Sequence, residues 1–153
     1  MLTPLVFFIV FGLLQLGQIG MGMMMVNYGA GSVARKTSRT SAVMANSANQ
    51  FRLDFESLMV VGMKAPALTS CLDSANGGVT NNVVVIAEAR LDAFPIIGPM
   101  LNAMAPDFKN SGDWKMPAGT CEPGPVPALG FTAEPPVYQF IVRGSAVARK
   151  NYL

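Results

Sequence analysis

Two cysteines, Cys71 and Cys121, are the side chains of this sequence best suited to covalent or metal chemistry. If the domain that carries them is exported, they lie in an oxidising compartment, where two cysteines in loop-like surroundings usually pair. A Cys71–Cys121 disulfide would close a loop of about fifty residues and contribute roughly 4 kcal/mol in the chain-entropy model. The alternative is two unpaired buried thiols. We expect no metal site, because the chain has no histidine and the cysteines stand alone.

The charged side chains favour solvated surfaces over catalysis. Without histidine there is no Ser-His-Asp or Cys-His arrangement and no imidazole ligand for zinc or haem. No glycine-rich phosphate loop followed by Lys-Ser/Thr is present. Asp54 and Glu56 fit the polar face of an amphipathic helix. Glu88, Arg90 and Asp92 alternate along a predicted strand, which is typical of the wet side of a sheet. We expect no enzymatic activity and no cofactor.

Composition sets the class of protein. A chain of 153 residues is one domain, or one domain with an extension. Only 13% of its residues are charged, about half the usual share for soluble domains, and 51% are hydrophobic. The net charge of +2, without a basic run or a nucleic-acid motif, argues against nucleic acid as a partner.

The apolar excess is concentrated at the N-terminus. Residues 2–26 are almost entirely apolar, and the first charges are Arg35 and Lys36. As a helix with a rise of about 1.5 Å per residue, this stretch of about twenty-five residues would span roughly 37 Å, enough to cross a bilayer. We therefore expect a transmembrane helix over residues 1–26.

Two simpler interpretations of this stretch stay open. A cleaved signal peptide would use Ala30-Gly31-Ser32 as its cleavage site, although no basic residue precedes the apolar run. A plain single-pass anchor is the other. Glycines at four positions and a cluster of methionines favour a helix packed among copies of itself, because glycine allows close helix contact and methionine fills irregular gaps; these residues are Gly12, Gly17, Gly20, Gly22, Met21, Met23, Met24 and Met25.

The helical pattern continues beyond the apolar stretch. Residues 27–64 carry small residues and then larger apolar residues at helical spacing, which predicts an amphipathic continuation lying against a small head. We expect one long helix ending by about residue 64, with a break near Gly29–Gly31 or Gly62 as an option.

Residues 65–153 form the predicted head. The β-branched run near 81–93 and the alternating run near 136–149 predict two strands, which pair as antiparallel neighbours across a long insertion. Within that insertion, residues 95–104 suit a helical turn. The proline-rich stretch 117–136 suits an ordered surface loop. The predicted fold class is therefore α+β, a long N-terminal helix with a small head that contains an antiparallel sheet.

Several stretches carry a resemblance to a known family, namely "PLVFFIVFGLLQLGQIG" (4–20), "NYGAGSVARKTSRTSAV" (27–43), "FPIIGPML" (94–101) and "VRGSAVARKN" (142–151). Together they resemble the type IV pilin superfamily, and within it most closely the TadE-like pilins of the tight-adherence (Tad) system. The resemblance covers about half of the chain. It implies a precursor held in the inner membrane, cleaved by a prepilin peptidase and passed by the pilus assembly machinery into an extracellular adhesion filament of identical subunits.

The chain departs from the family pattern in two ways. The family normally has a glutamate at the fifth mature position, whereas Leu5 stands here and no carboxylate precedes Asp54. No basic leader ending in glycine is visible either. Either Met1 is the mature N-terminus after removal of such a leader, or the chain begins differently. Assembly would then rest on apolar packing, and archaeal-type pilins, which resemble this chain in lacking the glutamate, are a related option.

The resemblance assigns roles to residues of the apolar helix. Gly17, Gly20 and Gly22 would form a stretch able to unwind during assembly. The expected filament-core packing residues are Leu5, Val6, Phe7, Phe8, Ile9, Val10, Phe11, Leu13, Leu14, Leu16 and Ile19.

Two other functions remain as alternatives. One is a minor pilin, a pseudopilin or another membrane-anchored accessory of a pilus or secretion machine. The other is a signal-anchored surface-binding module, for which Trp114 and the proline-rich stretch would be the contact candidates.

Overall fold

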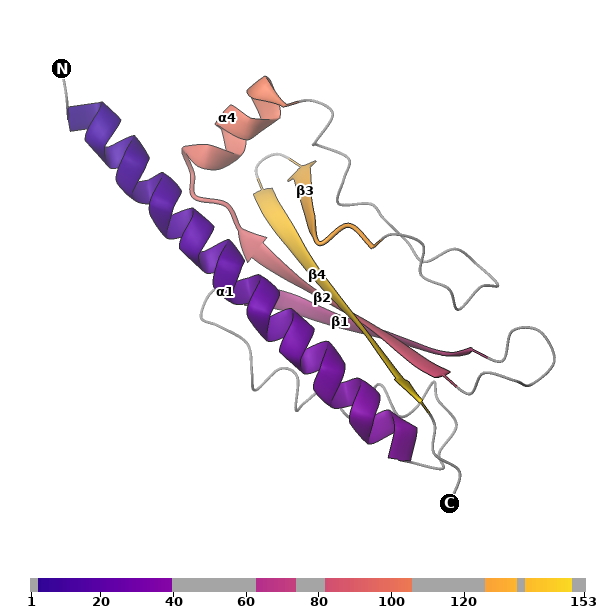
Figure 1. The fold of residues 1–153 in the computed structure, drawn as a ribbon. Coiled ribbons are helices and arrows are strands. Elements are labelled where there is room, and N and C mark those ends of the chain that lie inside the picture. Colours follow the sequence, from indigo (N-terminus) through magenta and orange to yellow (C-terminus); the bar gives the residue numbers. More distant parts are fainter. Residues whose placement is uncertain (1–2, 40–62, 74–81, 106–125, 135–136, 150–153) are drawn as a thin grey trace.

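The computed structural model describes residues 3–39, 63–73, 82–105, 126–134 and 137–149 of the chain. They form a long N-terminal helix and a small antiparallel sheet with a short helix at one end (Figure 1). In chain order, the elements are α1 (Thr3–Arg39), β1 (Met63–Asp73), β2 (Asn82–Asp92), α4 (Ile97–Met104), β3 (Leu129–Glu134) and β4 (Val137–Arg149).

The sheet has four strands in the order β1-β2-β4-β3, and every neighbouring pair is antiparallel. The central pair, β2 and β4, runs from Asn82 opposite Arg149 to Asp92 opposite Gln139. Because side chains alternate across a strand, this register puts Ala87, Ala89 and Leu91 on the same face as their partners in β4. That face is covered by α1.

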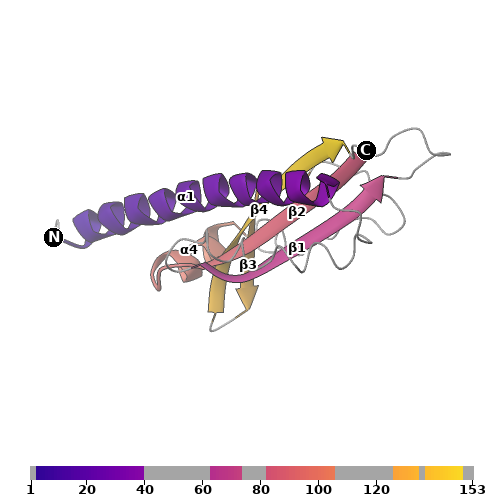
Figure 2. The ribbon, with the colours of Figure 1, turned by 90° about the horizontal axis from the view of Figure 1, so that it is seen from below.

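Helix α1 crosses the sheet on this one face, and its N-terminal part extends beyond the sheet (Figures 1 and 2). Its buried residues recur every three or four positions from Gln15 onward, as expected for one face of a helix. Small residues predominate among them and let the helix backbone approach the strands. The buried positions are Gln15, Ile19, Gly22, Val26, Gly29, Ala30, Val33, Ala34, Thr37 and Ser38.

Two glycines fix the closest approach between helix and sheet. A Cβ on Gly22 would lie 2.7 Å from Met63 Cε and 3.1 Å from Leu91 Cδ1. A Cβ on Gly144 of β4 would lie 2.6 Å from Asn27 Oδ1 and 2.9 Å from the Asn27 backbone nitrogen. All four distances are below ordinary van der Waals contact, so any larger residue at Gly144 would push the helix backbone away from β4.

The structure confirms the predicted long helix and the antiparallel sheet, including the pairing of the two predicted strands. It corrects two boundaries. Met63 and Lys64, which the sequence places at the end of the helix, lie in the edge strand β1. Pro66 makes this stretch look unlike a strand in the sequence, and the pairing of β1 with β2 shifts in register there, between Lys64 and Ala67. Residues 129–134, predicted as loop, form the short edge strand β3.

Other expectations are settled only in part. Helix α1 runs without a break through Gly29 and Gly31, and the expected helical turn after β2 is α4. The predicted continuation over residues 40–62, with Gly62, Asp54 and Glu56, lies outside the described residues, as does Trp114.

Candidate functional site

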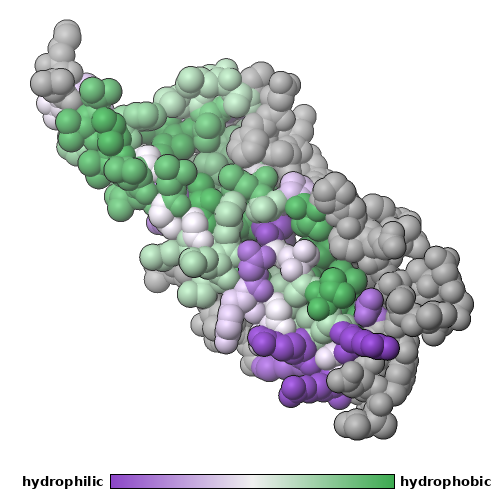
Figure 3. All heavy atoms as spheres, viewed as in Figure 1, coloured by the Kyte–Doolittle hydropathy of each residue, from purple (hydrophilic) through white to green (hydrophobic). Residues whose placement is uncertain are grey.

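The most distinctive surface of the molecule is the N-terminal part of α1, Thr3–Leu14, which we call the protruding segment. Its large apolar side chains are roughly half exposed: Leu5 is 56%, Phe7 56% and Leu13 64% exposed. They form a continuous apolar surface at one end of the molecule (Figure 3). An exposed patch of this kind on a soluble protein marks a contact with lipid or with another protein.

The protruding segment ends where two side chains attach α1 to the head. The Phe11 ring packs on Phe94 with centroids 5.6 Å apart, and Phe7 stacks on Phe11 at 6.2 Å. One turn later the buried Gln15 side chain accepts a hydrogen bond of 2.8 Å from the Phe94 backbone N–H through Oε1. Its Nε2 donates to Gln18 Oε1 at 3.5 Å. Gln15 thus ties the helix to the chain just after β2.

The predicted packing residues fall into two groups. Phe11 is partly buried against the head and Ile19 is buried in the core, so Ile19 packs within its own subunit. The remaining nine are exposed, namely Leu5, Val6, Phe7, Phe8, Ile9, Val10, Leu13, Leu14 and Leu16. By length and composition, α1 is able to span a membrane, as an anchor or a signal sequence does.

The three glycines expected to give flexibility differ in their surroundings. All three lie in regular helix. A Cβ on Gly17 or Gly20 would meet nothing within 4 Å, whereas Gly22 faces the sheet at close range. Gly22 therefore has a packing role, while Gly17 and Gly20 have no steric reason to be glycine among the described contacts.

Helix α4 continues the apolar surface from the protruding segment onto the head. It lies beside the N-terminal part of α1, at the end of the sheet (Figures 1 and 2). A small pocket of about 160 Å³ lies between Phe11 of α1 and the residues just before α4, namely Phe94, Pro95 and Ile96. Ile96 is 54% and Met104 73% exposed. Gly98 keeps α4 close to the sheet, since a Cβ there would lie 2.5 Å from Tyr138 Cβ.

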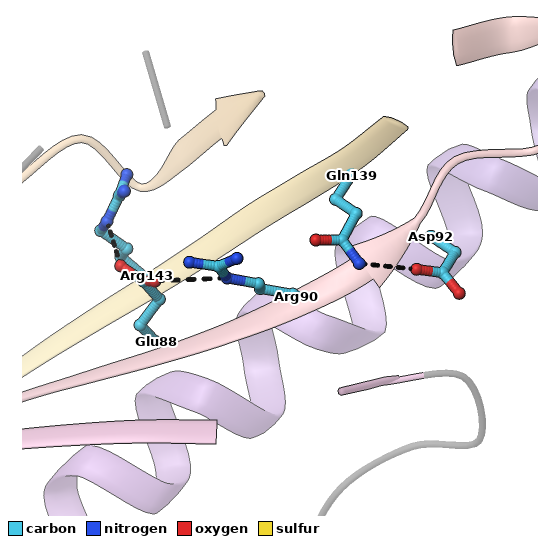
Figure 4. Close-up of polar contacts among 5 residues, drawn as sticks. All are labelled: Glu88, Arg90, Asp92, Gln139 and Arg143. Atoms are coloured by element: carbon cyan, nitrogen blue, oxygen red, sulfur yellow. Dashed lines mark hydrogen bonds and ion pairs between the residues drawn. The ribbon is translucent and has the colours of Figure 1, made fainter. Parts of the chain in front are cut away.

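A polar cluster occupies the sheet face away from α1 (Figure 4). The buried Arg143 Nε donates to Glu88 Oε2 at 2.9 Å, and Arg90 Nε lies 4.0 Å from Glu88 Oε1. The alternation of Glu88 and Arg90 was expected to mark the wet side of the sheet. Arg90 is exposed as expected, but Glu88 is mostly buried with Arg143, whose role the sequence did not reveal.

Asp92 lies further along the same face. It accepts a hydrogen bond from Gln139 Nε2 at 2.8 Å and pairs with Lys64 (Figure 4 shows the first contact). The hydrogen bonds from Lys64 and Gln139 hold the pKa of the Asp92 carboxyl below its ordinary value of 3.8.

The far end of α1 is basic. Ser32, Arg35, Lys36 and Arg39 line an open pocket of about 290 Å³ there, and this end is the most hydrophilic part of the face in Figure 3. The protruding segment and the basic side chains thus lie at opposite ends of this helix of 37 residues.

The described part of the chain bears on metal binding but does not test the predicted disulfide. No group of three or more His, Cys, Asp or Glu side chains within it is placed to hold a metal ion. Cys71 lies in β1 opposite Val84, while Cys121 is outside the described residues, so their pairing stays a prediction.

Comparison of the chain with protein-family models, with curated proteins and with solved structures finds no match. The functional conclusion therefore rests on the surfaces described above.

Proposed function

We propose that this chain is a structural subunit of the type IV pilin kind, closest to TadE-like pilins, that polymerises through α1 into a filament at the cell surface. Before assembly, α1 would hold the subunit in the inner membrane, where a prepilin peptidase and the pilus assembly machinery act on it. The observation that carries the proposal is the protruding segment, an apolar helix end whose large side chains, except Phe11, are left exposed by its own head.

The exposed area is large enough to drive assembly. Full burial of a large apolar side chain contributes about 1.5–3 kcal/mol, so covering the exposed half of each of the nine packing residues amounts to on the order of 10 kcal/mol. This is comparable to the whole folding stability of a small domain. Transfer from lipid to a filament gains less than transfer from water, and close helix packing must supply the difference.

The difference between the two parts of α1 also supports a subunit that folds before it assembles. From Gln15 to Ser38, one helix face is buried against the sheet, so the head and this part of α1 form a unit without a partner. The protruding segment then supplies a contact that can change from lipid to neighbouring helices. Because α1 carries no carboxylate between Thr3 and Arg39, this contact would depend on apolar packing.

Electron microscopy of material sheared from the cell surface, with mass spectrometry of the same fraction, tests the proposal. We expect thin filaments in which this chain is the main protein. If the chain is scarce there and remains with the membrane, it is an accessory or an anchored binding module, and the proposal of a bulk subunit is wrong.

A further inference from the structure

The exposed stripe of α4 forms a second apolar surface beside the protruding segment. Ile96 precedes the first residue of α4 and has helical backbone angles, with φ −87° and ψ −37°. Ile96, Met100 and Met104 are spaced four residues apart and therefore lie on one side of this short helix. Ile96 and Met104 are 54% and 73% exposed, and Met100 is half-buried. We call these three residues the α4 face. Residues 93–105 around it contain no charged side chain.

The α4 face lies level with a part of α1 whose exposed side chains need an apolar environment. Ile96 shares a pocket with Phe11, and Phe94 contacts the Phe11 ring. Leu13, Leu14 and Leu16, all more than half exposed, come after Phe11 in the helix. At a rise of about 1.5 Å per residue, Leu16 lies roughly 7 Å further toward the head than Phe11. If lipid surrounds α1 as far as Leu16, Ile96 therefore lies within the lipid as well.

The charges around the α4 face suit the boundary of a bilayer. Lys64 and Asp92 form an ion pair at the flank of α4, where they line a pocket with Pro95 and Pro99. Lysine side chains at such a boundary reach outward to the headgroups. The basic side chains Arg35 and Arg39 lie at the opposite end of α1. An interfacial helix buries its apolar side about 5–10 Å into the membrane surface. This agrees with the roughly 7 Å along α1 between Leu16 and the level of Phe11 and Ile96.

We infer that the α4 face is a membrane-contact surface: while α1 is inserted, Ile96, Met100 and Met104 lie in the boundary between lipid headgroups and acyl chains and hold the head against the bilayer. This inference rests on the membrane-held stage of the proposed function. It assigns α4 a partner, a phospholipid surface, that differs from the neighbouring subunits of a filament.

Site-directed spin labelling of the full chain in vesicles of phosphatidylcholine and phosphatidylglycerol tests this inference. A nitroxide amino acid is incorporated at Ile9, Met104 or Val147, which leaves Cys71 and Cys121 unchanged. Val147 is the matched control, an apolar β4 residue that is 62% exposed and far from α4. Collision with oxygen, which enters lipid, is compared with collision with a water-soluble nickel complex.

We expect the ratio of oxygen to nickel collisions to be highest at Ile9 and several-fold higher at Met104 than at Val147. Equal ratios at Met104 and Val147, with Ile9 in lipid, would overturn the inference and leave the proposed membrane stage intact. Shielding of Met104 from both reagents would mean that a second copy covers it, which also overturns the inference. A label at Ile9 that meets mainly nickel would overturn the membrane stage and the inference together.

A pair of charged variants gives an independent readout. Met104→Glu is expected to lower partitioning of the full chain into these vesicles several-fold, and Val147→Glu to leave it unchanged. Equal partitioning of the two variants, each checked for a native circular dichroism spectrum, would contradict a role for the α4 face in membrane contact.

Discussion

The two parts of one continuous helix, α1, differ in composition and in surroundings. The protruding segment exposes large side chains such as Leu13 and Leu14, and of its large side chains only Phe11 packs on the head. The docked part, from Gln15 to Arg39, places Gly22, Ala30 and Ala34 against the sheet. The small inward-facing side chains favour docking of this part, because they let its backbone approach the strands.

The docked part also carries apolar side chains on its outer side. Leu16, Met21, Met24 and Tyr28 on its outer side are all more than half exposed. A partner that covers the protruding segment can thus continue along the outer side of the helix toward its basic end. The comparison predicts that substitutions on the outer side of α1 change contacts with partners, whereas substitutions on its inner side change the stability of the fold.

The largest effect is expected from a charge in the protruding segment. Leu14→Asp, or Phe8→Asp, should abolish filament formation, because a carboxylate within an apolar helix bundle or a bilayer costs about 3 kcal/mol or more, a factor above one hundred. The head should keep its thermal unfolding midpoint, since Leu14 contacts solvent within its own subunit. Val147→Asp is the matched control. Normal filaments from Leu14→Asp would show that this segment is not the assembly contact.

The next effect concerns the glycines between helix and sheet. Gly144→Ala should lower the free energy of unfolding by about 1–3 kcal/mol, because the new methyl group meets the Asn27 backbone. Gly20→Ala, where 4 Å around the Cβ is open, should raise helix stability by up to about 1 kcal/mol. Urea denaturation measures both.

The same glycine series tests whether assembly needs local unwinding. If it does, Gly20→Ala would slow filament growth while stabilising the subunit. If Gly144→Ala proved as stable as Gly20→Ala, the close approach of α1 to β4 would be wrong.

A smaller effect is expected at the junction of the two parts. Gln15→Leu removes the acceptor of the Phe94 N–H and should cost about 1–2 kcal/mol, with faster hydrogen exchange at that amide. Gln18→Leu leaves the Phe94 bond in place and serves as the control. Equal exchange of the Phe94 amide in both variants would argue against Gln15 as the attachment point.

The smallest effect is a pH dependence at the polar edge of the head. Because the pKa of Asp92 is lowered in the folded state, its contribution is fully present above pH 4 and is lost as pH falls below about 4. For a pair this exposed the change is under about 1 kcal/mol. Asp92→Asn should remove this part of the acid dependence in thermal unfolding. The protruding segment carries no ionisable side chain, so its contacts should not change over the same range.

The sequence was informative where periodicity is strong and poor where contacts are distant. The apolar run and the β-branched run of β2 predicted α1 and the central strands. β1 and β3 were missed because edge strands tolerate proline and few β-branched residues. In the sequence, Gln15 is only a polar residue that interrupts an apolar run. Its hydrogen bond to Phe94 joins residues 79 positions apart, so no local pattern predicts it. Likewise, nothing local to Arg143 predicts its burial beside Glu88.

The most direct test of the division of α1 is photo-cross-linking in cells that produce the protein. A benzophenone amino acid is placed at Leu13 in the protruding segment, or at Val147 on the far side of the head. We expect ladders of cross-linked copies of this chain from Leu13 and none from Val147. Cross-links from Leu13 only to other proteins, or no cross-links from Leu13 at all, would contradict assembly through the protruding segment.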